Sequence, residues 1–201
     1  MTNKEFKEWE NSTEKLLTDC WKFRRLCGKP FDRGFIGELL VLKQLLDTHK
    51  ADLCSKLDNK IIYAGSANKE WDIELKLQQK VIQINAKATT TSDETNNPRW
   101  VRQSAKTFCD IKIRKDTRQS VSLKTQHNPS LFYVFVDVGA WLNNHVAQFF
   151  TLSDKKAKSV LGNRYFKRYN GQKRKSGSTD FWVEYADVKN FKDQRLIKLL
   201  K

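Results

Sequence analysis

Residues 71–89 read WDIELKLQQKVIQINAKAT, and apolar and polar side chains alternate along two segments of this stretch. Successive side chains of a β-strand point to opposite faces of its sheet. The alternation therefore predicts strands over 70–77 and 81–89. Gln78-Gln79-Lys80 lies between them and is expected to form the turn of a hairpin.

One face of this predicted hairpin is polar on both strands. It carries Asp72, Glu74, Gln83, Asn85 and Lys87. Antiparallel pairing brings such rows together. Carboxylate and amide oxygens are ligands for Mg²⁺, and an ammonium group offsets the charge of a phosphate. The pattern predicts a divalent-cation site beside a bound phosphate, although the same alternation is also typical of a solvated sheet face.

A helix is predicted upstream of the hairpin, over 33–48, with Asp32 as its N-cap. Glu38 lies on the apolar face of this helix. A carboxylate in such surroundings is unfavourable unless it finds a partner, and a metal ion would be one. Gly37 destabilises a helix by about 1 kcal/mol relative to alanine. We therefore expect a close approach of backbone or ligand at this glycine.

The remaining chain is expected to supply further helices and strands. Helices are predicted over 4–27, 153–161 and 188–200, strands over 61–65, 131–138, 146–152 and 181–185, loops over 91–98 and 165–179, and helical or irregular structure over 99–109. The expected fold class is α/β (α+β), with a mixed central β-sheet flanked by helices. The expected organisation is an N-terminal helical extension over 1–32 and one domain over 33–201.

The charge of the chain points to a polyanionic partner. Its 201 residues include 38 Lys and Arg against 23 Asp and Glu, which gives a net charge of +15. Nucleic acid is the first candidate and an anionic membrane surface the second, while a generally basic protein is the plain alternative. The cations cluster in residues 99–118 and, with no acid among them, in residues 155–175.

Two classes of protein are disfavoured by composition. No apolar run approaches the roughly 20 residues of a membrane span, and residues 1–10 do not resemble a secretory signal. The four cysteines are widely spaced and form no CxxC pair. We therefore expect free thiols and a cytoplasmic location.

The order of these features resembles the PD-(D/E)XK nuclease superfamily. Gly37-Glu38 lies on an early helix, Asp72 in a strand, and Ile84-Asn85-Ala86-Lys87-Ala88-Thr89 in the next strand. The resemblance covers about residues 35–200. Asn85 departs from it, because the superfamily usually has Glu or Gln at this position. Asn85 therefore either reduces the affinity for metal, or Glu38 or Glu74 supplies the missing charge.

The resemblance implies a restriction-endonuclease-like fold and a Mg²⁺-dependent DNA endonuclease, most simply a type II restriction enzyme, with Mn²⁺ as a substitute metal. Catalytic roles fall to Glu38, Asp72, Asn85 and Lys87, and metal ligation to Asp72, Glu38, Asn85 and Glu74. The alternatives are a catalytically weakened or inactive nucleic-acid binding module of the same fold and a structure-specific or RNA-directed nuclease.

The partner implied by this reading is double-stranded DNA. The expected DNA contacts are Lys167, Arg168, Asn170, Gln172, Lys173, Arg174, Lys175, Arg99 and Arg102. The cations would bind phosphates. The amides of Asn170 and Gln172 are able to read base edges, although a loop of this composition more often positions phosphates or is a mobile surface segment. Cutting a palindromic site requires two active sites, which implies a two-fold homodimer.

Overall fold

The computed structural model describes residues 1–28, 32–65, 70–78, 80–89, 99–113, 115–116, 118–172, 179–193, 196 and 199, with the main chain alone at 99–103, 113 and 180. The helices are α1 (Asn3–Cys27), α2 (Arg33–Cys54), α3 (Val138–Asn144), α4 (Asp154–Ala157), α5 (Asn163–Tyr169) and α6 (Tyr185–Val188). The strands are β1 (Lys60–Tyr63), β2 (Ile73–Leu77), β3 (Lys80–Thr89), β4 (Arg99–Ser104), β5 (Cys109–Ile113), β6 (Gln119–Leu123), β7 (Leu131–Asp137), β8 (Gln148–Ser153) and β9 (Asp180–Glu184).

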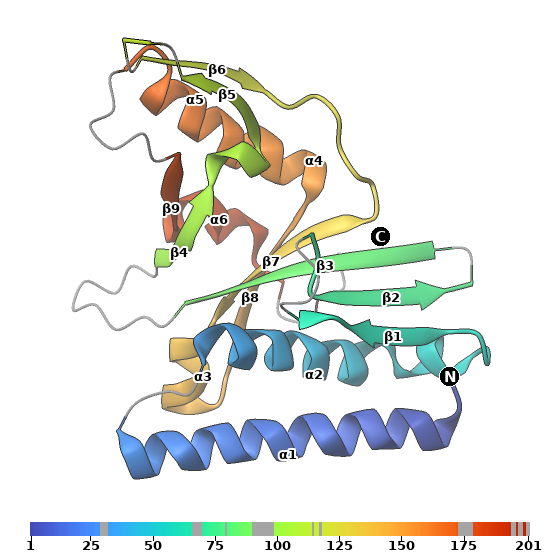
Figure 1. Ribbon diagram of the computed structural model, residues 1–201. Helices are drawn as coiled ribbons and strands as arrows, with labels where there is room; N and C mark the ends of the chain where they lie inside the picture. Colours follow the sequence, from blue (N-terminus) through green and yellow to red (C-terminus); the bar gives the residue numbers. More distant parts are fainter. Residues whose placement is uncertain are drawn as a thin grey trace.

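A five-stranded sheet in the order β1-β2-β3-β7-β8 forms the centre of the molecule (Figure 1). β3 and β7 are parallel, and every other neighbouring pair is antiparallel. The predicted hairpin is present, with Ile73 opposite Ile84, although β2 begins at Ile73 rather than at Glu70. This mixed sheet flanked by helices confirms the predicted fold class.

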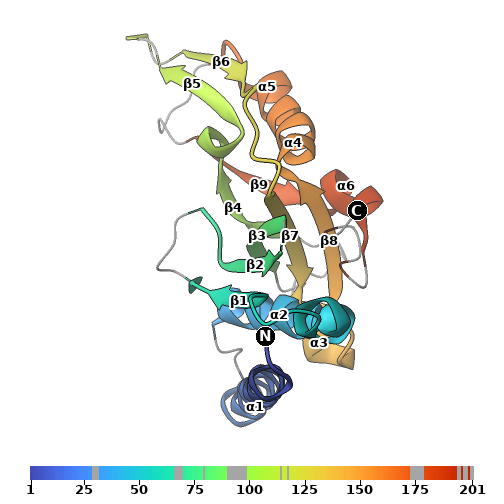
Figure 2. The ribbon, with the colours of Figure 1, turned by 90° about the vertical axis from the view of Figure 1, so that its right-hand side faces the viewer.

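Two helices are layered on one face of the sheet. α2 lies against the sheet, and α1 packs on the outer side of α2 (Figures 1 and 2). The core between α2 and the sheet includes the fully buried side chains of Ile36, Leu45 and Ile84. A Cβ added at Gly37 would lie 2.6 Å from the Cβ of Ala88. The expected close approach is therefore the contact of α2 with β3, and only glycine fits there.

The helix ends follow local rules. The Asp32 side chain accepts hydrogen bonds of 2.8 and 3.2 Å from two main-chain amides in the first turn of α2, which confirms the predicted N-cap. α2 continues past the predicted end to Cys54, through non-helical dihedral angles at His49. α1 ends at Cys27 and is capped by Gly28, whose φ of 68° is readily adopted by glycine.

The other face of the sheet is covered by a part of the chain that we call the distal lobe, made of β4, β5, β6, α4, α5, β9 and α6 (Figures 1 and 2). In it β4 pairs with β9, and β5 with β6. A second core cluster joins the distal lobe to β7 and β8, with Phe108, Phe135, Phe150 and Tyr165 fully buried. The sheet therefore lies between α2 and the distal lobe.

Three expectations about secondary structure are wrong. Residues 99–109 contain β4 and the start of β5, joined by a short 3-10 helix. The expected basic loop over 165–179 begins as helix α5. No α-helix begins within the described residues of 188–200, where Lys192 instead bridges to Phe150. Partners distant in the sequence determine these segments, and local periodicity carries no information about them. The loop expected over 91–98 lies outside the described residues.

None of the described helices combines the length and the apolar character that crossing a bilayer would require. The four cysteines are free thiols, as predicted.

Candidate active site

Asp72 lies where the chain enters β2. Its amide donates a hydrogen bond of 2.8 Å to the carbonyl of Ile84, which sets Asp72 beside Asn85 in the register of the hairpin. Its carboxylate is buried, and Oδ2 accepts a hydrogen bond of 2.7 Å from the amide of Ala86. Burial raises the pKa of Asp72, while the charge of Lys87 and the Ala86 amide act to lower it. The carboxylate is thus held against the main chain between Asn85 and Lys87.

Asn85 and Lys87 share the face of β3 that is turned away from α2. Asn85 is 8% exposed, and its Nδ2 donates to the carbonyl of Glu70 at 3.0 Å. Its Oδ1 is buried and has no hydrogen-bond partner among the described residues. The half-buried Lys87 is close enough for its charge to act on the pKa of Asp72. The predicted site therefore has an available acceptor oxygen beside a carboxylate and an ammonium group.

Glu38 belongs to the same neighbourhood, although it comes from α2. The hydroxyl of Tyr63 at the end of β1 donates to Glu38 Oε2 at 2.5 Å. Burial raises the pKa of Glu38, and the negative charge of Asp72 acts in the same direction. The hydrogen bond from Tyr63 and the positive charge of Lys87 act to lower this pKa. The charges of Asp72 and Lys87 therefore act on Glu38, and the catalytic roles of the three residues stay predictions. Nothing in the sequence pattern indicated Tyr63.

Glu74 lies two residues after Asp72 in the hairpin, opposite Gln83. It is buried, and its two oxygens have partners: Oε2 accepts from Gln83 Nε2 at 2.8 Å, and Oε1 pairs with Lys76 at 3.3 Å. A metal-ligand role for Glu74 stays a prediction, and it would require the ion pair with Lys76 to open. The sequence pattern did not distinguish Glu74 from Asp72, because both are acids on the same strand face. Their partners differ in the structure: Glu74 contacts two side chains, whereas Asp72 accepts a hydrogen bond from a main-chain amide.

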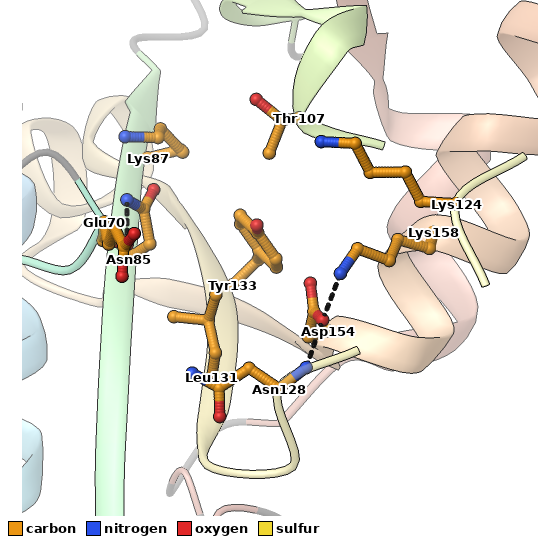
Figure 3. Close-up of a pocket in the computed structure, with 10 residues that line it drawn as sticks. All are labelled: Glu70, Asn85, Lys87, Thr107, Lys124, Asn128, Leu131, Tyr133, Asp154 and Lys158. Carbon is orange, nitrogen blue, oxygen red and sulfur yellow. Dashed lines mark hydrogen bonds and ion pairs between the residues drawn. The ribbon is translucent and has the colours of Figure 1, made fainter. Parts of the chain in front are cut away.

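A pocket of about 360 Å³ lies between the sheet and the distal lobe (Figure 3). It is lined by Glu70, Asn85, Lys87, Leu131 and Tyr133 on one side and by Thr107, Lys124, Asn128, Asp154 and Lys158 on the other. Of these lining residues, the sequence patterns indicated only Asn85 and Lys87 as members of a site.

Asp154 directly follows Ser153, whose predicted role as a helix cap is confirmed. The Ser153 hydroxyl accepts a hydrogen bond of 3.3 Å from the amide of Lys156.

The predicted DNA contacts differ in where the structure places them. Lys167 and Arg168 lie on helix α5 and not in a loop. The carbonyl of Asn170 is engaged, because its Oδ1 accepts a hydrogen bond of 3.1 Å from the amide of Val121 on β6. Gln172 is exposed in the following turn. Outside the described residues lie Lys173, Arg174 and Lys175, together with the side chains of Arg99 and Arg102.

No protein-family model matches this chain, and no curated protein matches it. Among solved structures, it is similar to a bacterial homing endonuclease, I-Ssp6803I, at 12% sequence identity and a TM-score of 0.38, over 63% of this chain and 70% of that chain. A likeness at this level assigns no function, so function is inferred from the residues of the site.

Proposed function

We propose that this protein is a Mg²⁺-dependent endodeoxyribonuclease of the PD-(D/E)XK type that acts on duplex DNA, in the manner of a type II restriction enzyme, and accepts Mn²⁺ in place of Mg²⁺. The observation that carries the proposal is the grouping of Asp72, Asn85 and Lys87 beside a pocket whose opposite wall also carries lysines. A phosphodiester is anionic, so a site that hydrolyses it has to stabilise further negative charge on the phosphate.

The donor set suits Mg²⁺. Asp72 and Glu38 are carboxylates whose burial and mutual repulsion a cation would relieve. Asn85 Oδ1 is a buried acceptor without a partner in the described structure. Mg²⁺ is typically bound by one or two carboxylates together with water and substrate phosphate. No three Asp, Glu, His or Cys side chains form a metal-binding group among the described residues, so Glu38, Asp72 and Glu74 do not converge there as a three-carboxylate site. When bound, Mg²⁺ would stabilise charge on the phosphate and acidify an attacking water.

The side chains of the protein have separate tasks in this proposal. Lys87 offsets the charge that develops on the phosphate and orients the attacking water. The amide of Ala86 holds Asp72, and the hydroxyl of Tyr63 holds Glu38, before the substrate arrives. Such preorganisation avoids rearrangement during the reaction.

The net charge of +15 supports DNA as the substrate. Lys167 and Arg168 on α5 are proposed to contact phosphates, as is the run from Lys173 to Lys175. Phosphate contacts of this kind hold any duplex sequence. Cleavage at a palindromic site would require a homodimer.

One observation favours a second candidate, a nucleic-acid binding module that has lost catalysis. Asn85 is neutral where an acid or glutamine is usual in the superfamily that the sequence resembles. A neutral ligand weakens cation binding, and the pocket would then serve to bind the phosphate backbone without cleaving it.

Incubation with supercoiled plasmid DNA and Mg²⁺ separates these candidates. The wild type, the wild type with EDTA and an Asp72→Asn/Lys87→Ala double variant are compared. Discrete fragments that disappear in the two controls are expected for a restriction-type enzyme, and a smear indicates a nonspecific nuclease. Retention of plasmid in a gel without cleavage would identify the binding module.

A further inference from the structure

The pocket wall opposite the sheet is held by a buried ion pair. Asp154 is 1% exposed and begins α4, and its Oδ2 accepts hydrogen bonds from the amide of Asn128 at 2.7 Å and from Lys158 Nζ. Lys158 Nζ also donates to the carbonyl of Gln126 at 2.9 Å. The pair therefore fastens the segment 124–130, which connects β6 to β7, at two points.

Lys124 is the first residue of this segment. Its amide donates to the carbonyl of Phe108 at 3.3 Å, which anchors it to the distal lobe. Its half-buried side chain lines the pocket, and its Nζ makes no hydrogen bond or ion pair with any residue in the described part of the chain. Figure 3 shows this amine extending toward Thr107, whereas the amine of Lys158 is directed at Asp154. Lys158 is thus neutralised within the protein, and Lys124 is not.

Two lysines therefore line one pocket from opposite sides, Lys87 from the sheet and Lys124 from the segment 124–130. Lys87 has the carboxylate of Asp72 nearby, whereas Lys124 has no acidic partner among the described residues, so an anion in the pocket would meet the positive charge of Lys124. A phosphate suits both amines, because a lysine ammonium contacts phosphate as a mobile point charge.

We propose that Lys124 is a second contact to the phosphate backbone of the substrate, and that Asp154 and Lys158 are positioning residues for Lys124. This inference rests on the proposed function and specifies its substrate contact. The DNA backbone is held between Lys87 on the sheet and Lys124 on the distal lobe, so it enters the molecule between these two layers.

The test of Lys124 measures the binding of a fluorescent DNA duplex by anisotropy in EDTA, over a series of salt concentrations. Lys124→Ala should weaken binding about tenfold and flatten the salt dependence by about one unit. Lys124→Arg should bind like the wild type. The control is Lys155→Ala, which removes the same charge from an exposed position on α4. Equal effects of Lys124→Ala and Lys155→Ala would overturn the proposal.

The positioning role is tested by a double-mutant cycle. The variant Asp154→Asn/Lys158→Gln removes the ion pair without changing the net charge of the pocket wall, so it should weaken binding in the wild-type background and have no further effect when Lys124 is already alanine. Additive effects would refute positioning through Lys124. This assay contains no metal and reports binding alone. A wild type that binds DNA here but does not cleave plasmid in the presence of Mg²⁺ would end the nuclease proposal alone. A wild type that does not bind DNA would end both.

Discussion

The amide of Ala86 donates a hydrogen bond of 2.7 Å to Oδ2 of Asp72, so the acid at the start of one strand is tied to the main chain of the next. Ala86 lies between Asn85 and Lys87, and the bond sets the carboxylate beside both. The position of Asp72 depends on this acceptor oxygen, whereas its proposed role in cation binding depends on its charge. Substitutions at Asp72 can therefore separate its structural role from its role in cation binding.

Asp72→Asn is expected to keep the fold and lose the metal site. Asparagine still accepts from Ala86, and the unfavourable burial of a charge is removed, so the melting temperature should be unchanged or higher. Mg²⁺ affinity should fall at least about tenfold. Asp72→Ala leaves the Ala86 amide without a partner and should lower the free energy of unfolding by about 1–3 kcal/mol. Thermal unfolding and calorimetric titration measure these effects. Wild-type Mg²⁺ affinity in Asp72→Asn would refute its role as a ligand.

The raised pKa values of Glu38 and Asp72 predict how stability and metal binding depend on pH. A carboxyl group with a higher pKa in the folded protein than in the unfolded chain binds its proton more tightly when folded. Without metal, the free energy of unfolding should therefore fall as pH rises from the ordinary carboxyl pKa through the raised one. Mg²⁺ affinity should rise over the same interval, because the ionised acids bind the cation.

Urea unfolding at a series of pH values checks this prediction. Glu38→Gln should flatten the fall in stability. Tyr63→Phe removes the hydrogen bond that lowers the pKa of Glu38, so it should extend the fall to higher pH. A Glu38→Gln protein with the same pH profile as the wild type would show that Glu38 does not titrate in the way proposed.

Gly37→Ala should destabilise the protein, although alanine favours a helix over glycine by about 1 kcal/mol. The new Cβ would lie 2.6 Å from Ala88 Cβ, and overpacking of this kind costs about 1–3 kcal/mol. Ala88→Gly in the same chain should restore part of the loss. Chemical denaturation of the single and double variants measures this. A Gly37→Ala protein more stable than the wild type would mean that α2 moves away from β3 at little cost.

The cations on α5 should contribute to DNA affinity through phosphates. Replacing Lys167 and Arg168 by alanine should flatten the salt dependence of binding by about two units, and replacing Lys173, Arg174 and Lys175 by roughly two to three units, with similar effects on specific and nonspecific DNA. Lys15 and Lys22 are exposed on α1, away from the distal lobe, and their double alanine variant is the control. A loss confined to one DNA sequence would indicate base readout by these residues.

The parts of the site that the sequence could predict are those governed by local rules. Alternation along the strand predicted that Asn85 and Lys87 share one face. Glu38 was predicted as a site residue because it is a carboxylate on an otherwise apolar helix face. The difference between Asp72 and Glu74 was not predictable, because it depends on the register and on the neighbours that each carboxylate meets.

The far wall of the pocket was not predictable either. Lys124 and Asp154 are brought to Lys87 by the packing of the distal lobe on the sheet. That packing depends on pairings such as β4 with β9, which join segments far apart in the chain. The strand over residues 99–104 was not predictable for the same reason, because its partner β9 lies far along the chain.

The most direct test of the nuclease proposal is the single-turnover rate of plasmid cleavage in Mg²⁺, measured for the wild type, Lys87→Ala and Lys60→Ala. Lys60 is the control, since it is an exposed lysine on strand β1 of the same sheet. We predict that Lys87→Ala lowers the rate at least about 100-fold with DNA binding largely retained, because a group that stabilises the developing charge is lost. Lys60→Ala should cleave like the wild type. Equal rates for Lys87→Ala and Lys60→Ala, or no cleavage by the wild type, would contradict the proposed function.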